Sequence, residues 1–255
     1  DLGIKKESIE TDNGHIVVGG ERHPYGKFVA TAASLTASTE APLKSPSEFR
    51  YIRRESPRVD AIAKATGTAQ FGIDVDIPNM HHAVVVRSPV AGARLQSVDK
   101  TEAKQMPGVT DIIEIGSGVA VVAKKFWQAK TAAETLNPKW QDVPLAKVDT
   151  STLRDDYQAA MANEEGPVGP DDGDLNAAFS SAANVLEGEY WTPFLAHAPL
   201  EPMNAVVRIE NGEADVWSGT QGPPGAQGLV SRFSGIPPEN VRVHQTYMGG
   251  SFGRR

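Results

Sequence analysis

The sequence predicts an α+β protein of one or two domains. Short runs of β-branched residues, such as residues 83–86, alternate with segments whose apolar residues recur at helical spacing. Turn-forming pairs separate these runs, and Asn211-Gly212 is the strongest of them. At roughly 150 residues per domain, the 255 residues correspond to one or two domains, and they suffice to bury a core without disulfides.

The N-terminal segment, residues 1–57, is expected to form a hairpin, a helix and an extended linker. Asp12-Asn13-Gly14 is a turn signal that precedes a β run at 15–18. Residues 25–35 carry apolar side chains at helical spacing, which predicts a helix. Residues 36–57 are rich in Ser, Thr and Pro without periodicity, so we interpret them as the linker.

Residues 58–146 are predicted to form a compact unit with two helices on a small sheet. Strands are expected at 71–75, 83–86, 111–115 and 119–123. A short helix is expected to begin at Asp99, with Glu102 as its capping-box partner, and a longer helix is expected at 126–136. Packing both helices on the sheet would bury their apolar faces.

Residues 147–255 are predicted to hold two polar helices followed by a second β-rich unit. The polar helices are expected at 151–162 and 174–182, on either side of a Gly- and Pro-rich acidic loop at 164–173. Strands are expected at 185–190, 204–209, 213–217 and 241–244, with a helix at 226–233.

The composition excludes several classes of function. The chain has 25 Lys and Arg against 32 Asp and Glu, and it contains no basic run, so we expect no nucleic-acid or anionic-membrane partner. It has no Cys and therefore can form no disulfide, thiolate metal site or iron–sulfur cluster of its own. No apolar stretch approaches the roughly 18 residues of a membrane-spanning helix.

Two loops are candidates for a binding site. Residues 248–255, Met-Gly-Gly-Ser-Phe-Gly-Arg-Arg, leave the last predicted strand, and such glycines let backbone N–H groups approach an anion or an oxo group. Gln221 lies between a strand and a helix, where its amide can donate to an anionic ligand. On the residues alone, a frayed tail and a solvated strand-to-helix turn remain open as alternatives.

A third segment combines His197, Glu201 and Asn204 between two β runs. His197 and Glu201 could form an acid–base pair or bind a metal, but the H-x-x-x-E spacing lacks a third ligand. A structural Glu201 that anchors the backbone N–H groups of a loop is the commoner outcome. We therefore predict no metal-ligating residues in this chain.

Taken together, these strings resemble the large, molybdopterin-binding subunit of the xanthine dehydrogenase/aldehyde oxidoreductase family, in particular the branch that contains the β-subunit of isoquinoline 1-oxidoreductase. The matching strings are residues 58–75, 80–89, 106–109 and 195–204, the Thr220-Gln221 turn, and residues 249–255. The resemblance implies that 1–57 ends a preceding cofactor-domain segment and that 58–146 is an a/b hammerhead domain. It also implies that 147–255 is the first part of a molybdenum-cofactor-binding α/β domain.

The resemblance implies hydroxylation of an aldehyde or N-heteroaromatic carbon, with water as the oxygen source. The implied cofactor of the complete enzyme is molybdopterin, expected in its cytosine dinucleotide form, and iron–sulfur clusters on a partner would carry the electrons away. The family glutamine beside the molybdenum oxo ligand is Gln221 here, which we assign as catalytic and cofactor-binding. The resemblance also implies cofactor-binding roles for Gly249, Gly250, Ser251, Phe252, Gly253 and Arg254, with Ser251 at a position where the family commonly has glycine.

The family continues for several hundred residues beyond this loop, including the glutamate taken as general base, and the chain begins without Met. We therefore expect an internal fragment that is inactive and holds no cofactor by itself. Its implied partners are the rest of the large subunit, a small iron–sulfur subunit and a small-molecule substrate, and a further candidate is a cytochrome subunit. The sequence does not settle the compartment, and the resemblance favours a periplasmic location over a cytoplasmic one. The alternative is a non-catalytic scaffold or interaction module that reuses the hammerhead fold.

Overall fold

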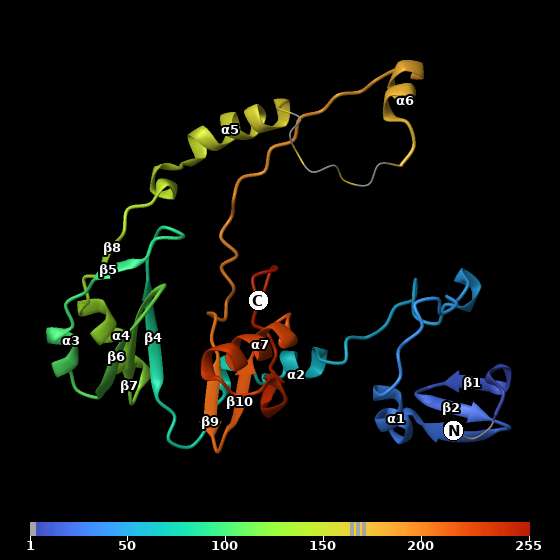
Figure 1. Ribbon diagram of the computed structural model, residues 1–255, viewed down its shortest axis with the longest axis horizontal. Helices are drawn as coiled ribbons and strands as arrows, with labels where there is room; N and C mark the ends of the chain where they lie inside the picture. Colours follow the sequence, from blue (N-terminus) through green and yellow to red (C-terminus); the bar gives the residue numbers. More distant parts are fainter. Residues whose placement is uncertain (1–3, 164–165, 167–168, 170–171) are drawn as a thin grey trace. The chain divides into compact units, whose positions relative to one another are not determined.

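The computed structural model describes residues 4–163, 166, 169 and 172–255, and the chain divides into two compact units, Asp1–Ile62 and Ala63–Arg255 (Figure 1). The division into 1–57, 58–146 and 147–255 stays a prediction. The loop predicted at 164–173 lies largely outside the described residues. Within the described ranges, no helix is both long enough and apolar enough to cross a membrane.

The first unit is built on an antiparallel three-stranded sheet in the order β1-β2-β3. Its elements are β1 (Ile9–Asp12), β2 (His15–Val18), β3 (Glu21–Pro24) and α1 (Val29–Ala33). The strand predicted at 15–18 is confirmed as β2, whereas the helix predicted at 25–35 is shorter, because a 3₁₀ turn occupies its first residues. Arg22 and Arg50 each donate to the Asp12 carboxylate at 3.0 Å, which ties the linker to the hairpin.

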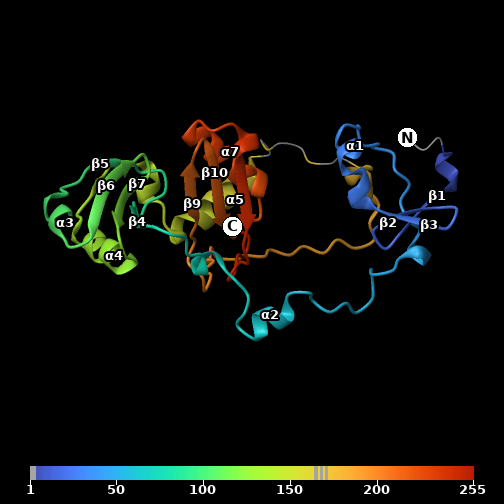
Figure 2. The ribbon, with the colours of Figure 1, turned by 90° about the horizontal axis from the view of Figure 1, so that it is seen from below.

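The second unit begins with α2 (Ala61–Ala65), which crosses the boundary, and then contains a sheet covered by two helices, as predicted (Figure 2). The sheet has the antiparallel order β4-β7-β6, with β4 (His82–Arg87), β6 (Val109–Ile115) and β7 (Gly118–Ala123). The remaining elements are α3 (Thr101–Gln105), α4 (Phe126–Thr135) and the pair β5 (Leu95–Ser97) and β8 (Lys139–Trp140). Both helices pack on one face of the sheet, because alanines from each lie in its buried cluster.

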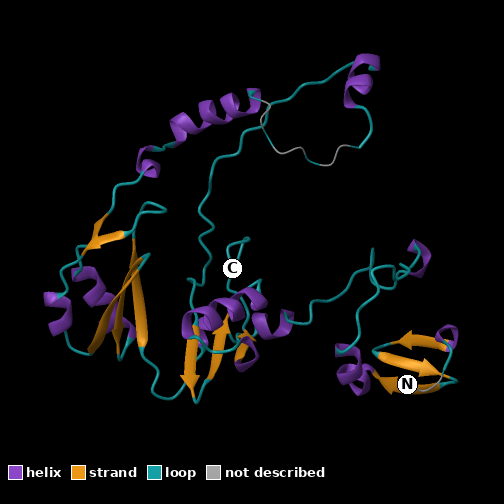
Figure 3. Ribbon diagram, in the orientation of Figure 1, coloured by secondary structure: helices purple, strands orange, loops and turns teal. Residues whose placement is uncertain are grey.

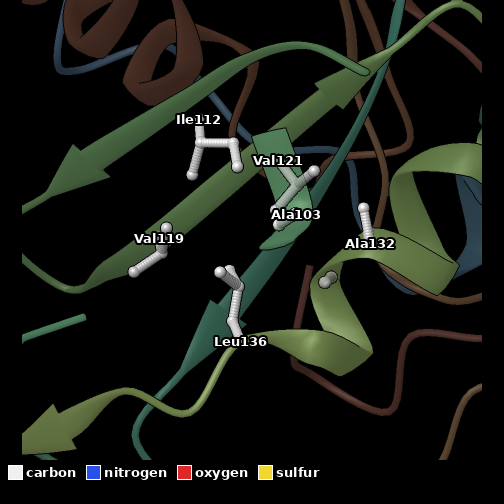
Figure 4. Packing of buried hydrophobic residues seen from close by; sticks show 7 residues of the cluster. Ala103, Ile112, Val119, Val121, Ala132 and Leu136 are labelled. Carbon is white, nitrogen blue, oxygen red and sulfur yellow. The ribbon is translucent and has the colours of Figure 1, made fainter. Parts of the chain in front are cut away.

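That cluster is the larger of the two hydrophobic cores among the described residues. Its buried members are Ala103, Ile112, Val119, Val121, Ala132, Ala133 and Leu136. Figure 4 shows the labelled side chains converging between the sheet and the helices. Val119 and Val121 are fully buried, and they lie on the inward face of the central strand. The β-branched run that predicted this strand therefore also supplies the centre of the core.

Gly118, the first residue of β7, fits only as glycine, because a Cβ there would lie 2.2 Å from the backbone oxygen of Val86. Gly118 pairs with Arg87 in the register of β4 and β7. The Gly118→Ala variant must separate the two strands at this pair, so we expect it to lower the free energy of unfolding by about 1–3 kcal/mol. Urea denaturation measures the effect. Gly116→Ala is the matched control, since a Cβ at Gly116 meets nothing within 4 Å; equal losses for both variants would contradict the prediction.

Two predicted strands and one predicted cap are wrong. Residues 71–75 form a 3₁₀ turn, Gly72–Asp74, because the Asp74 carboxylate accepts from the Phe71 N–H and competes with strand pairing. Residues 185–190 are extended but are no strand, since no pairing partner lies beside them in the described part of the chain (Figure 3). The capping box of Asp99 with Glu102 is replaced by bonds from Thr101 to Asp99.

The C-terminal part of this unit contains a sheet in the order β11-β10-β9. Its elements are β9 (Val206–Glu210), β10 (Glu213–Ser218), α7 (Pro223–Ser234) and β11 (Val241–Gln245), and they follow α5 (Thr150–Ala162) and α6 (Leu175–Ser181). The Asn211-Gly212 turn is confirmed, with both residues at positive φ between antiparallel β9 and β10. The helix α7 starts earlier than predicted, at Pro223, and links β10 to the parallel strand β11.

Asp215 on β10 is the centre of a polar cluster that ties the three strands together. Its carboxylate accepts from His244 Nε2 and Arg208 Nη2, both at 2.7 Å, and from Arg242 Nε at 3.1 Å. The hydrogen bond to His244 and those to the two arginines hold the pKa of the Asp215 carboxyl well below its usual range. This cluster fixes the sheet whose carboxyl end carries the candidate site.

Candidate functional site

The parallel pairing of β10 and β11 brings the two predicted loops together. Ser218 ends β10 beside Gln245, which ends β11, so the chain leaves both strands at the same edge of the sheet. Gln221 lies in the loop after β10, and residues 246–255 follow β11. Ligands of open α/β sheets bind at the carboxyl ends of parallel strands, so this edge is the expected place for a site.

Hydrogen bonds join the two loops directly. Gln245 Nε2 donates to the carbonyl of Thr220 at 2.9 Å, and Thr246 N donates to the carbonyl of Ser218 at 3.2 Å. At the tip, Ser251 Oγ donates to Gln221 Oε1 at 2.5 Å. The structure thus brings Gln221 together with the glycine-rich loop.

Glu201 anchors this arrangement from a third segment. Its side chain is only 5% exposed and accepts from four donors. These donors are Ile73 N at 3.0 Å and Asn204 Nδ2, Gly249 N and Arg255 Nη1 at 2.8 Å each. The structural role predicted for Glu201, the anchoring of loop N–H groups, is confirmed.

Burial raises the pKa of the Glu201 carboxyl, but the hydrogen bonds from Asn204, Gly249 and Ile73 and the charge of Arg255 outweigh burial and hold the pKa below its usual value. Glu201 is therefore ionised at neutral pH and is matched by a guanidinium. An ionised carboxylate only accepts hydrogen bonds, and it has no proton to donate to a substrate.

Gly249 is required for the approach of the glycine-rich loop to Glu201. A Cβ on Gly249 would lie 2.4 Å from the Cβ of Glu201, which is far inside contact distance. The Glu201 N–H also donates to the carbonyl of Gly249 at 3.0 Å, so the two backbones are paired here. Any side chain at this position would break that pair.

Arg255 is the residue of this site that sequence reasoning did not select. Its side chain is 2% exposed, and its Nη2 donates to the carbonyls of Glu201 and Pro202. The sequence contained one signal for this role: a buried Glu201 would need a cation, and Arg254-Arg255 is the basic pair at the end of the glycine-rich loop.

The site offers free hydrogen-bond donors to an oxygen-rich or anionic group. In the described part of the chain, no group accepts from Gln221 Nε2 or from the N–H groups of Gly250, Ser251, Phe252 and Gly253. Arg254 is exposed and lines an adjacent hollow of about 140 Å³, together with Thr220 and Asn204. These donors fit a molybdopterin group, but the hollow is smaller than the roughly 300–1,000 Å³ of ligand pockets.

The structure does not bring together the other pair of candidate residues, His197 and Glu201. His197 is exposed, and neither a hydrogen bond nor an ion pair joins it to Glu201, so the two do not form an acid–base pair in this structure. Across the residues that the structure describes, no group of three or more His, Cys, Asp or Glu side chains could hold a metal ion.

Two family models match the chain in the order that the motifs indicate. The model described as "Aldehyde oxidase and xanthine dehydrogenase, a/b hammerhead domain" matches residues 66–119, and the "Molybdopterin cofactor-binding domain" model matches residues 160–255. The hammerhead and cofactor-binding character of the two parts is therefore confirmed.

Curated relatives are similar over most of the chain. The β-subunit of isoquinoline 1-oxidoreductase from Brevundimonas diminuta is 31% identical over 240 residues, which cover 89% of this chain and 30% of that protein. The PaoC molybdenum-binding subunit of aldehyde oxidoreductase from Escherichia coli (strain K12) is 26% identical over 234 residues, which cover 81% of this chain and 31% of that protein. The chain thus spans less than a third of the length of either relative.

Solved structures show the same fold. Reconstituted CO dehydrogenase from Oligotropha carboxidovorans superposes with a TM-score of 0.59 at 24% identity, over 78% of this chain and 31% of that one. Aldehyde oxidoreductase from Desulfovibrio gigas gives 0.58 at 22% identity, over 77% and 27%.

The chain contains a hammerhead segment and a molybdopterin cofactor-binding segment, in that order. Residues 66–119 and 160–255 match domains of the xanthine dehydrogenase/aldehyde oxidoreductase family, and the chain is similar to molybdenum-binding subunits of that family and to the β-subunit of isoquinoline 1-oxidoreductase.

Proposed function

We propose that this chain supplies the hammerhead domain and one wall of the cofactor site in a molybdenum hydroxylase that oxidises an aldehyde or an N-heteroaromatic carbon. In that reaction the substrate carbon exchanges hydrogen for an oxygen from water, and two electrons and two protons leave. Bound molybdenum would supply the oxygen transfer and accept the two electrons. The chain's own residues would orient the bound group and donate hydrogen bonds to it.

The observation that supports this proposal best is the convergence of Gln221 with the glycine-rich loop at the carboxyl edge of β10 and β11. Gln221 Nε2 and the free backbone N–H groups would hold an oxo group and the pterin, and Arg254 would hold a phosphate, since a guanidinium can bind phosphate through two hydrogen bonds. Glu201 would hold the loop.

The proposal includes the partners and compartment that the resemblance implies. The cofactor would be the cytosine dinucleotide form of molybdopterin, and the rest of the large subunit would complete its site. A small iron–sulfur subunit would take the electrons and a cytochrome subunit would be a further acceptor, in the periplasm rather than the cytoplasm. The isolated 255 residues would hold no cofactor and would not turn over.

The test is denaturing mass spectrometry, molybdenum analysis and an assay in ¹⁸O-labelled water on the native preparation that contains this chain. We expect near-stoichiometric molybdenum, further polypeptide of the same family, and ¹⁸O in the oxidised product of an aldehyde or an N-heteroaromatic compound. A single 27.2 kDa species without molybdenum would instead support a non-catalytic scaffold or interaction module.

A further inference from the structure

The glycine-rich loop is closed at both ends on one residue. At its start, Gly249 N donates to Glu201 Oε2 and Gly249 O accepts from Glu201 N. At its end, Arg255 Nη1 donates to the same Glu201 Oε2. We call the pair Glu201 and Arg255 the clamp. Since both partners are buried, water and salt screen the attraction between their charges far less than in a surface ion pair.

The closed loop presents Ser251 to Gln221. Arg255 N lies 3.4 Å from Ser251 Oγ and donates to it, so the hydroxyl proton is directed elsewhere. That proton is donated to Gln221 Oε1 at 2.5 Å. The sequence of bonds from Arg255 N through Ser251 Oγ to Gln221 Oε1 therefore has one direction.

This direction matters because a glutamine amide has two nearly equivalent orientations. Its terminal torsion is broad and roughly two-fold, and its oxygen and nitrogen have the same shape but opposite hydrogen-bonding character. A donor on Oε1 selects one orientation and leaves both Nε2–H groups for another acceptor. In the described residues that acceptor is absent.

We propose that Ser251 is a positioning residue that fixes the Gln221 amide with its Nε2–H donors toward a ligand acceptor, and that the clamp of Glu201 and Arg255 holds Ser251 in place. The ligand class is an oxo or anionic oxygen, a group that accepts and does not donate. The identity of that ligand rests on the proposed function, whereas the positioning does not.

The first test is NMR on the ¹⁵N-labelled 255-residue chain, which requires no cofactor. In the wild type we expect the Gln221 side-chain amide to be ordered, with a higher heteronuclear NOE than that of Gln105, an exposed residue on α3. In Ser251→Ala the Gln221 value should fall to that of Gln105, and in Ser251→Thr it should recover, because threonine restores the hydroxyl.

One further NMR signal and one control variant separate a positioning role of Ser251 from a general effect on folding. The Gly249 amide reports the clamp and should not move in Ser251→Ala, because that variant leaves Glu201 and Arg255 intact. Ser181→Ala removes a hydroxyl that is bonded only within α6 and should leave Gln221 unchanged. A Gln221 amide that is mobile in the wild type, or that is indifferent to Ser251→Ala while Gly249 is unchanged, would overturn the proposal.

The second test uses the complete enzyme. Ser251→Ala should lower kcat by about fivefold, about 1 kcal/mol, with KM unchanged, since orientation of a transition-state donor is lost and substrate binding is not. Equal kcat in the two proteins would contradict positioning. If the amide is ordered by Ser251 but the complete protein binds no molybdenum, the proposed function fails and the positioning inference stands.

Discussion

A Gln221→Ala variant of the complete enzyme is expected to turn over about 10²–10³-fold more slowly than the wild type, the usual cost of removing one preorganised donor from a site where charge develops. Gln221 Nε2 has no acceptor in the described structure, and its orientation is set by Ser251. The alanine variant removes that donor, while the loop remains clamped on Glu201. The measurement is kcat in protein shown to be molybdenum-replete.

Gln221→Glu distinguishes the donor from the shape of the side chain. The glutamate keeps an acceptor for Ser251 Oγ but carries no N–H, so its loss of kcat should be of the same order as that of alanine. Gln105→Ala, a change of the same size at an exposed position on α3, is the control and should leave kcat unchanged. An unchanged kcat in replete Gln221→Ala protein would remove Gln221 from the catalytic site.

The sequence was sufficient to predict elements whose cause is local. The hairpin at Asn211-Gly212 forms because both residues tolerate positive φ, and the strands at 83–86 and 119–123 follow from runs of β-branched residues. The strand predicted at 71–75 failed because Asp74 bonds back to Phe71. The strand predicted at 185–190 failed because alternation predicts extended backbone without specifying a partner.

The candidate site shows the same division between local and long-range causes. Gln221 and residues 249–253 could be marked as candidates from their own loops, because glycines and an amide can present hydrogen-bond donors, and the family resemblance assigned them to the cofactor. Arg255 could not, because its role depends on Glu201, 54 residues earlier in the chain. The contact between Ser251 and Gln221 likewise exists only once β10 and β11 pair in parallel.

The clamp is expected to be the costliest part of this site to break. Arg255→Met keeps much of the apolar stem but leaves Glu201 as a buried carboxylate without its cation, which should lower the free energy of unfolding by about 3–5 kcal/mol. Urea denaturation of the 255-residue chain measures this loss. Arg254→Met is the matched control: that side chain is exposed and, in the described structure, forms no ion pair, so its change should stay within about 0.5 kcal/mol.

Pairing with Glu201, rather than lost packing, is what the double variant tests. Glu201→Gln together with Arg255→Met should cost less than the two single changes added, because each single change leaves one buried charge unmatched whereas the double variant leaves none. The pH dependence gives the same discrimination. Since the pKa of the folded Glu201 lies below its usual value, its contribution to stability is complete above the ordinary carboxyl range and is lost as the pH falls through the folded value. The deficit of Arg255→Met should therefore shrink in acid, whereas a deficit that is constant with pH would assign Arg255 to packing alone.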